Sequence, residues 1–160
     1  MLTPAELTGA FARNLSILKT QADGLTNADS LMQPPFRGNC LNWVLGHIAE
    51  NRDSVLEALG EQPVMGAAGV RYKRESEAVT AAGEGVMPLE ELLARLDRSQ
   101  ERLAAALSRT DEEALAREFR SGERRLTVAQ RVFFLYFHET YHVGQTELLR
   151  QLAGKNDKVI

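Results

Sequence analysis

Three observations in the sequence predict an all-α fold, a four-helix bundle. Four segments of about 20 residues place apolar side chains at the three- and four-residue intervals of an amphipathic helix. No convincing pair of segments shows the strict apolar–polar alternation of paired strands. The connection between the second and third helical segments is long, about 27 residues. It can therefore cross the bundle from end to end and let these two helices run parallel.

The first helix is expected from about Thr3 to about Gly24, with a capping box at its start. The threonine hydroxyl can cap the helix, and Glu6 follows three residues later, as that motif requires. Residues 26–38 contain two consecutive prolines and are expected to form a loop. The second helix is expected over about residues 39–59 and ends before a glycine.

The second half of the chain is expected to hold the other two helices. Residues 61–87 carry four glycines and are expected to form at most one short helix. The third helix is expected from about Pro88 to about Arg109. The fourth is expected from its capping residue, Thr127, to near residue 153. The best strand candidate is the segment 119–126, in which a Ser-Gly pair could form a turn.

Length and composition indicate one domain, residues 1–160, of ordinary globular character. Charged residues make up 26% of the chain and the net charge is −3, which argues against a general affinity for nucleic acid or anionic membranes. The single cysteine excludes an internal disulfide and suits a reducing compartment. The N-terminus lacks the pattern of a signal peptide, and no segment is apolar enough to span a membrane. We therefore expect a cytoplasmic protein without nucleic-acid or membrane partners.

The three histidines of the chain are the candidate functional residues. His138 and His142 are four residues apart on the fourth predicted helix, so their side chains are neighbours on one face. His47 lies on the apolar stripe of the second predicted helix. If these two helices are antiparallel, the distances to their predicted ends place all three histidines at a similar depth. An isolated inward-facing histidine is commonly an ordinary core residue, but this joint placement favours a shared metal site.

A three-histidine site has a defined chemistry. Imidazole suits zinc, copper, nickel and iron(II). Three protein ligands leave at least one position open for water or substrate, which is typical of catalytic rather than structural zinc sites. A metal bound in this way can activate water or polarise a ligand atom.

Residues 138–142 also match the His-Glu-x-x-His pattern of zinc proteases, in which the glutamate is the general base. The third ligand of those enzymes is missing, because the expected downstream histidine and distant glutamate are both absent. No sheet is predicted beside the helix either. We therefore do not expect a peptidase, and Glu139 is expected to be a partner of a ligand or a solvated residue.

Two segments around the histidines resemble the paired signatures of the DinB/YfiT-like family of metalloenzymes. Residues 42–47, Asn-Trp-Val-Leu-Gly-His, resemble the first signature. Residues 138–145, His-Glu-Thr-Tyr-His-Val-Gly-Gln, resemble the second, a His-x-x-x-His motif followed by Gly-Gln. The resemblance covers the whole chain in order and spacing, and it matches all three family ligands, which are His47, His138 and His142.

The resemblance implies a four-helix bundle of up-down-down-up type with a long crossover, often assembled as a homodimer. It implies a divalent metal, most often zinc or nickel, held by the three histidines together with water. Several relatives are similar to thiol-dependent S-transferases or isomerases, whose cosubstrate is a low-molecular-weight thiol such as bacillithiol or mycothiol. The implied function is a metalloenzyme, a thiol-dependent transferase or a hydrolase, that acts on a small electrophile. The sequence assigns no catalytic residue.

Several neighbouring residues have two interpretations each. Cys40 could be a soft ligand or a nucleophile, or it could be a small buried side chain, and the last is favoured. Trp43 and Tyr141 could line a pocket above the metal or pack in the core. Gln145 could orient bound water or lie at the pocket edge. The basic residues 71–74 could hold an anionic substrate, although a solvated charge run is favoured.

Two functions other than an enzyme remain open from the sequence. The first is a non-catalytic metal- or ligand-binding bundle, acting in stress response, and it rests on the lack of a clear acid–base partner beside the histidines. The second is a purely structural bundle whose histidines no longer bind metal. Neither is excluded by any motif in the chain.

Overall fold

The structure of the protein is a computed structural model that describes residues 3–157. It is mostly helical, as predicted. The four long helices are α1 (Pro4–Ala22), α3 (Leu41–Ala58), α4 (Leu89–Ser108) and α6 (Val128–Leu152). The shorter elements are α2 (Asn27–Ser30), the 3-10 helix η1 (Gly66–Tyr72), α5 (Glu112–Ala116), β1 (Glu118–Ser121) and β2 (Arg124–Thr127).

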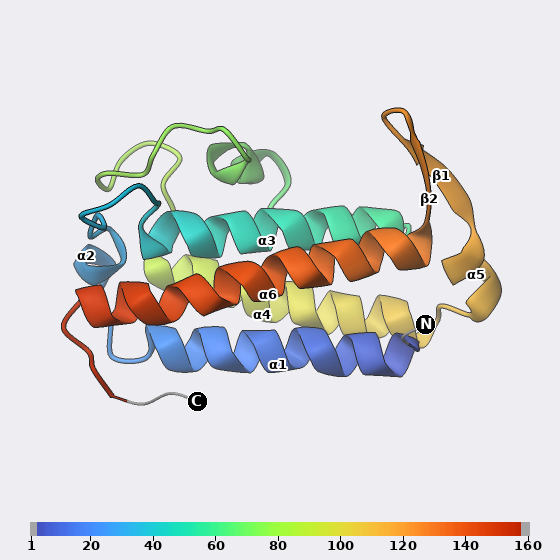
Figure 1. Cartoon of the computed structure of the whole chain (residues 1–160), viewed down its shortest axis with the longest axis horizontal. Coiled ribbons are helices and arrows are strands. Elements are labelled where there is room, and N and C mark those ends of the chain that lie inside the picture. The colour runs from blue at the N-terminus through green and yellow to red at the C-terminus, as the bar shows by residue number, and fades with distance from the viewer. Residues whose placement is uncertain (1–2, 158–160) are drawn as a thin grey trace.

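The four long helices lie side by side, and each has two of the others as its principal neighbours (Figure 1). α3 contacts α6 and α4, and α1 contacts the same two helices from the opposite side. The colour gradient in Figure 1 shows that α1 and α6 run in one direction, whereas α3 and α4 run in the other. α3 and α6 are therefore antiparallel, which is the arrangement that places the three histidines at a similar depth.

The starts of the first and last long helices, α1 and α6, follow from local sequence. The Thr3 hydroxyl accepts the Glu6 backbone N–H at 3.2 Å, and the Glu6 carboxylate accepts the Thr3 N–H in return. Thr127 and Gln130 form the same reciprocal motif at the start of α6. Because each motif satisfies two backbone donors that a helix start leaves unpaired, it determines where the helix begins.

Two buried apolar clusters form the core, one toward each end of the long helices. α1 contributes Leu18 to one cluster and Phe11 to the other. Between them lies a buried ion pair of Arg52 on α3 and Glu139 on α6, with 2.8 Å between Nη2 and Oε1. No helix within residues 3–157 is both long and apolar enough to cross a lipid bilayer.

The long connection between α3 and α4 is held along the outer side of α3 (Figure 1). The Asp53 carboxylate on α3 accepts the three consecutive backbone N–H groups of residues 64–66, at 2.7–3.0 Å. Tyr72, the last residue of η1, is fully buried. Its hydroxyl accepts the Met87 N–H at 2.7 Å and donates to the Asn42 side chain at 3.3 Å. These bonds fix the connection beside His47.

One short element differs from the sequence-based expectation. The segment 27–30 forms α2 inside the predicted loop, because Thr26 and Asp29 make a third capping box. The strand candidate near residue 119 does form, as an antiparallel hairpin that pairs Glu118 with Thr127 and turns at Gly122. The fold is thus helical with one small hairpin, which projects beyond the ends of α3 and α6 (Figure 1).

Candidate metal centre

The three histidines of the chain, called the triad below, meet between α3 and α6. One ring nitrogen from each of His47, His138 and His142 lies within 4.8 Å of the others. The Nε2 atoms of His138 and His142 are 3.3 Å apart. Two ligands at 2.0–2.1 Å from a tetrahedral zinc ion are about 3.3–3.4 Å apart, so this spacing fits a metal. The residues singled out in the sequence are therefore together, and the group could hold one metal ion.

Hydrogen bonds orient two of the three rings. The Nδ1 atom of His47 is 2.7 Å from the backbone carbonyl of Tyr72, and only an N–H can donate to that oxygen. The Nδ1 atom of His142 lies 2.8 Å from the side-chain oxygen of Gln145 in the same way. In a neutral imidazole the proton at Nδ1 leaves Nε2 with its lone pair, the form that binds metal. The Asn51 amide lies 3.2 Å from Nε2 of His47, as expected for an acceptor nitrogen.

His47 is also held by packing on both sides of its helix. Its ring stacks on Trp43, with centroids 4.6 Å apart and planes 19° apart. Gly46, the residue before it, lets the Tyr72 ring reach the helix, because a Cβ at position 46 would lie 2.1 Å from that ring. The glycine therefore permits the approach that brings the Tyr72 carbonyl to His47. Gly46 thus contributes to the site indirectly, because it allows the connection between α3 and α4 to pack beside His47.

Burial keeps the three imidazoles neutral at physiological pH. It lowers the pKa of His47 and His142 below the ordinary value of 6.5. At His138 burial, together with the neighbouring histidines, lowers the pKa to about 4. The Nδ1 atom of His138 is also buried and, within residues 3–157, has no hydrogen-bond partner. Three neutral rings with lone pairs facing one point fit a divalent cation far better than a proton.

These pKa shifts predict a loss of stability in acid for the metal-free protein. Unfolded imidazoles take up protons near pH 6.5, whereas burial lowers the pKa of all three folded rings, that of His138 to about 4. Acid therefore favours the unfolded state, which binds more protons. Urea unfolding with a chelator, from about pH 7 to 4, should show a steeper loss for wild type than for a triple variant with alanine at positions 47, 138 and 142. Parallel curves would contradict this.

Glu139 is neither a partner of the histidines nor solvated, which corrects the sequence-based expectation. Its side chain is 2% exposed and forms two hydrogen bonds to the Arg52 guanidinium, at 2.8 and 2.9 Å. One residue along a helix from His138 means a turn of about 100°, which directs Glu139 into the core rather than toward the triad. The general base of the protease pattern is therefore committed elsewhere, and the geometry gives no support to a peptidase.

The other residues weighed from the sequence take different positions. Cys40 is fully buried as a small core residue, and its thiol donates to the Val79 carbonyl at 3.1 Å. Tyr141 is 62% exposed and packs edge-on against His142. Gln145 orients His142 directly rather than lying unbound at an edge. Among the basic residues 71–74, Arg71 donates to two backbone carbonyls of its own loop, so that side chain is occupied.

Sequence reasoning missed two groups that contact His47, namely Asn51 and the Tyr72 carbonyl, and one carboxylate a helical turn away, Glu50. Glu50 and Asn51 follow His47 by three and four residues, so helical spacing alone could have placed them near the same face. Glu50 is half-buried, and burial raises the pKa of its carboxyl group. The Tyr72 carbonyl leaves no signal in the sequence, because it is a backbone group in an irregular segment.

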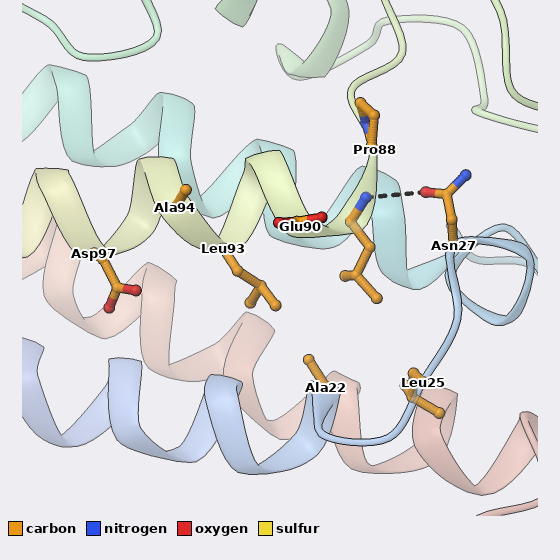
Figure 2. A pocket seen from close by; sticks show the side chains of 9 residues that line it. Ala22, Leu25, Asn27, Pro88, Glu90, Leu93, Ala94 and Asp97 are labelled. Carbon is orange, nitrogen blue, oxygen red and sulfur yellow. Dashed lines mark hydrogen bonds between the residues drawn. The ribbon is translucent and has the colours of Figure 1, made fainter.

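A separate pocket lies between α1, α2 and the start of α4, away from the triad (Figure 2). Asn27 closes one side of it, and its side-chain oxygen accepts the Leu89 backbone N–H at 2.9 Å. Two carboxylates, Glu90 and Asp97, stand at its edge, and Lys19 already pairs with Asp97 at 2.9 Å. Its remaining lining is largely apolar, so this pocket adds no reactive group to the candidate site.

A comparison with protein families agrees with the fold and the histidine pattern. A family model described as the DinB superfamily matches residues 10–146. The chain belongs to the DinB superfamily. It is similar to a solved structure described as the conserved protein of a locus from Enterococcus faecalis, at 17% identity and a TM-score of 0.75, over 96% of this chain and 98% of the other. At that identity the likeness concerns the fold alone. No curated protein matches the chain significantly.

Proposed function

We propose that this protein is a metal-dependent enzyme whose divalent metal, zinc or nickel, is held by His47, His138 and His142. The observation that carries the proposal is the meeting of three neutral imidazoles whose nitrogen atoms lie within 4.8 Å of one another. No fourth histidine, cysteine or carboxylate joins this group among the described residues. Three ligands with open positions are typical of catalytic metal sites.

The proposed reaction is thiol-dependent S-transfer to a small electrophile, with a low-molecular-weight thiol as cosubstrate. A bound metal would stabilise the thiolate at neutral pH. In the reaction the S–H proton leaves, a sulfur–carbon bond forms, and the leaving group departs with its electron pair. Glu50 is the candidate proton acceptor, because it is half-buried, lies one helical turn from His47 and has a raised pKa caused by burial. A hydrolase that activates water at the same site is the related alternative.

The enzyme proposal is tested by metal analysis followed by turnover. Protein reconstituted with zinc or nickel should hold about one ion per chain, and a variant with all three histidines replaced by alanine should hold none. The metal-loaded protein should then consume a thiol together with a model electrophile, and Glu50→Gln should lower that rate. Binding of metal without turnover across a panel of thiols and electrophiles would reject the transferase.

A non-catalytic metal- or ligand-binding bundle, acting in stress response, is the second candidate. One observation favours it: the groups that hydrogen-bond the imidazoles, from Tyr72, Asn51 and Gln145, are all neutral. None of them can exchange a proton in a reaction near neutral pH. Tight binding of a ligand without chemical change would favour this function over the enzyme.

We further propose that the protein is a homodimer that pairs through α6. Four exposed apolar side chains lie along one stripe of this helix, with exposed fractions between 53% and 63%: Phe134, Phe137, Tyr141 and Leu148. Gly144 lies in the same stripe, and a Cβ built there would meet no atom within 4 Å. These four side chains and Phe133 each have a surface of about 200 Å², of which a little more than half is exposed. Burying the exposed part on two copies would remove roughly 1,000 Å² from water, which is near the minimum for a specific interface.

The stripe is complementary to itself in an antiparallel pair. With Tyr141 at the two-fold axis of the proposed dimer, Phe134 faces Leu148 of the second copy. The large Phe137 faces position 145, next to the gap at Gly144. The stripe borders the triad, because the Phe134 ring stacks near His138 with centroids 6.3 Å apart. A second copy would therefore shield one side of the site from water.

The dimer should dissociate when the stripe is charged. Light scattering coupled to size exclusion should give the dimer mass for wild type and the monomer mass for a Phe137→Glu, Tyr141→Glu variant. Val70→Glu is the matched control, since Val70 is 60% exposed and lies in η1, outside the stripe. A wild-type monomer, or an unchanged dimer in the double variant, would contradict the proposed interface.

The remaining expectations form part of the same proposal. The up-down-down-up four-helix bundle is supported by the helix directions in Figure 1. We propose that residues 1–160 act as one domain in the cytoplasm, on a small-molecule substrate and without nucleic-acid or membrane partners. The net charge of −3 supports the absence of a nucleic-acid partner.

A further inference from the structure

A second cavity lies between α3, α6 and the hairpin, at the end of α3. Its volume is about 380 Å³, which falls within the range of small-molecule sites. We call it the arginine pocket, and it is lined by Ser54, Glu57, Ala58, Arg117, Phe119, Val128 and Arg131. α3, α6 and the hairpin strand β1 all contribute to it, so three separate segments converge on one small space.

The two arginines of this pocket have no carboxylate partner within residues 3–157. Seven of the fifteen arginines each have a carboxylate within 4.0 Å, and Arg117 and Arg131 are among the eight for which no such partner is described. Neither guanidinium group donates a hydrogen bond to another residue in that range, and Arg131 is half-buried whereas Arg117 is exposed. Glu57 is the one acidic residue of the lining, so the pocket has a net charge of about +1. Two unpaired guanidinium groups are well suited to an anion.

The pocket is aligned with the triad along both helices. Ser54 follows His47 by seven residues on α3, and Arg131 precedes His138 by seven residues on α6. Seven residues are about two turns, so both residues return to the face of the histidines about 10 Å along the axis. Because α3 and α6 are antiparallel, the two offsets point toward the same end of this helix pair (Figure 1).

We propose that the arginine pocket binds the anionic group, a carboxylate or a phosphate, of a small molecule whose other end reaches the triad. This inference rests on the proposed function, because it defines the substrate class of that site. The substrate is an anion whose charged group lies about 10 Å from its reactive group, measured along the helix axes. Arg131 and Arg117 are binding residues in this proposal, and Ser54 supplies a hydroxyl donor beside them.

Anion binding can be measured without a metal, which separates this inference from the metal proposal. Succinate and inorganic phosphate should each perturb the nuclear magnetic resonance signals of the pocket residues in chelator-treated protein. Binding should weaken about tenfold in Arg131→Ala or Arg117→Ala and recover partly in Arg131→Lys. Arg98→Ala is the matched control, since Arg98 is exposed on α4, outside the pocket. Equal affinity in Arg131→Ala and Arg98→Ala, or no binding of either anion, overturns the site.

A length series tests the link between the pocket and the triad. Mercaptocarboxylates of increasing chain length are the probe, added to zinc-loaded protein. Affinity should pass through a maximum at the length that reaches both sites, because the second contact is then intramolecular. Arg131→Ala should abolish the maximum, and the triple histidine variant should keep succinate binding. A maximum that persists in Arg131→Ala, or no maximum at all, overturns the link. Loss of metal binding with succinate binding intact rejects only the metal proposal.

Discussion

Glu139→Gln should lower the free energy of unfolding by about 3–5 kcal/mol, because it leaves a buried guanidinium without its counter-charge. The Arg52 side chain is 0% exposed and lies in the middle of the long helices. It donates two hydrogen bonds to Glu139 on α6 and one to the Phe11 carbonyl on α1, at 3.0 Å. It also donates to Ser99 on α4 at 3.2 Å, so one side chain joins all four helices. Urea unfolding of the two proteins measures the loss.

An exposed ion pair supplies the control for this prediction. Lys19 and Asp97 are 2.9 Å apart, but their side chains are 52% and 44% exposed. Asp97→Asn should therefore cost no more than about 1 kcal/mol. A double variant, Arg52→Met with Glu139→Leu, should recover much of the stability, because it removes both buried charges together. Equal losses in Glu139→Gln and Asp97→Asn would show that the buried pair has no special role.

Zinc or nickel should stabilise the folded protein strongly. At a metal concentration about 1,000 times the dissociation constant, the free energy of unfolding should rise by about 4 kcal/mol. For a chain of this size that corresponds to about 8–16 °C in melting temperature. The cause is linkage, since the three imidazoles are brought together only in the folded chain. Thermal unfolding with and without metal measures the shift.

The metal-induced rise in melting temperature should depend on the triad and not on the thiol of Cys40. His47→Ala should remove most of the increase, because two remaining imidazoles on α6 no longer connect it to α3. Cys40→Ala should keep the full increase, since the Cys40 thiol is bonded to the Val79 carbonyl and does not belong to the histidine group. An equal metal-induced shift in wild type and His47→Ala would place the ion elsewhere on the protein.

Local sequence was sufficient for most of the helices and for the grouping of the histidines. The capping box at Thr3 and the cap at Thr127 were both expected from a few residues of sequence, and both are present. Gln130 completes a capping box at Thr127 as well. The four-residue spacing of His138 and His142 is likewise a local property. The place of His47 opposite them needed one further assumption, that α3 and α6 are antiparallel, and Figure 1 shows that they are.

The chemistry around the triad required the tertiary structure. The sequence suggested a ligand partner or a solvated residue at Glu139, but its partner Arg52 is 87 positions away. The carbonyl that orients His47 belongs to Tyr72, 25 positions away, in a segment without periodicity. The outward direction of Phe134 and Phe137 was also undetermined, because apolar side chains occur all round α6.

The difference between what the sequence determined and what required the tertiary structure has a physical cause. Helix starts and shared helix faces depend on residues within about four positions of each other. The sequence alone therefore determined that this chain is helical and that its histidines lie on the apolar stripes of two helices. The partners that orient each ring, bury Glu139 and leave the arginine pocket positively charged come from distant segments. Their positions depend on how whole helices pack, which leaves no local pattern in the chain. Only the tertiary structure could decide them.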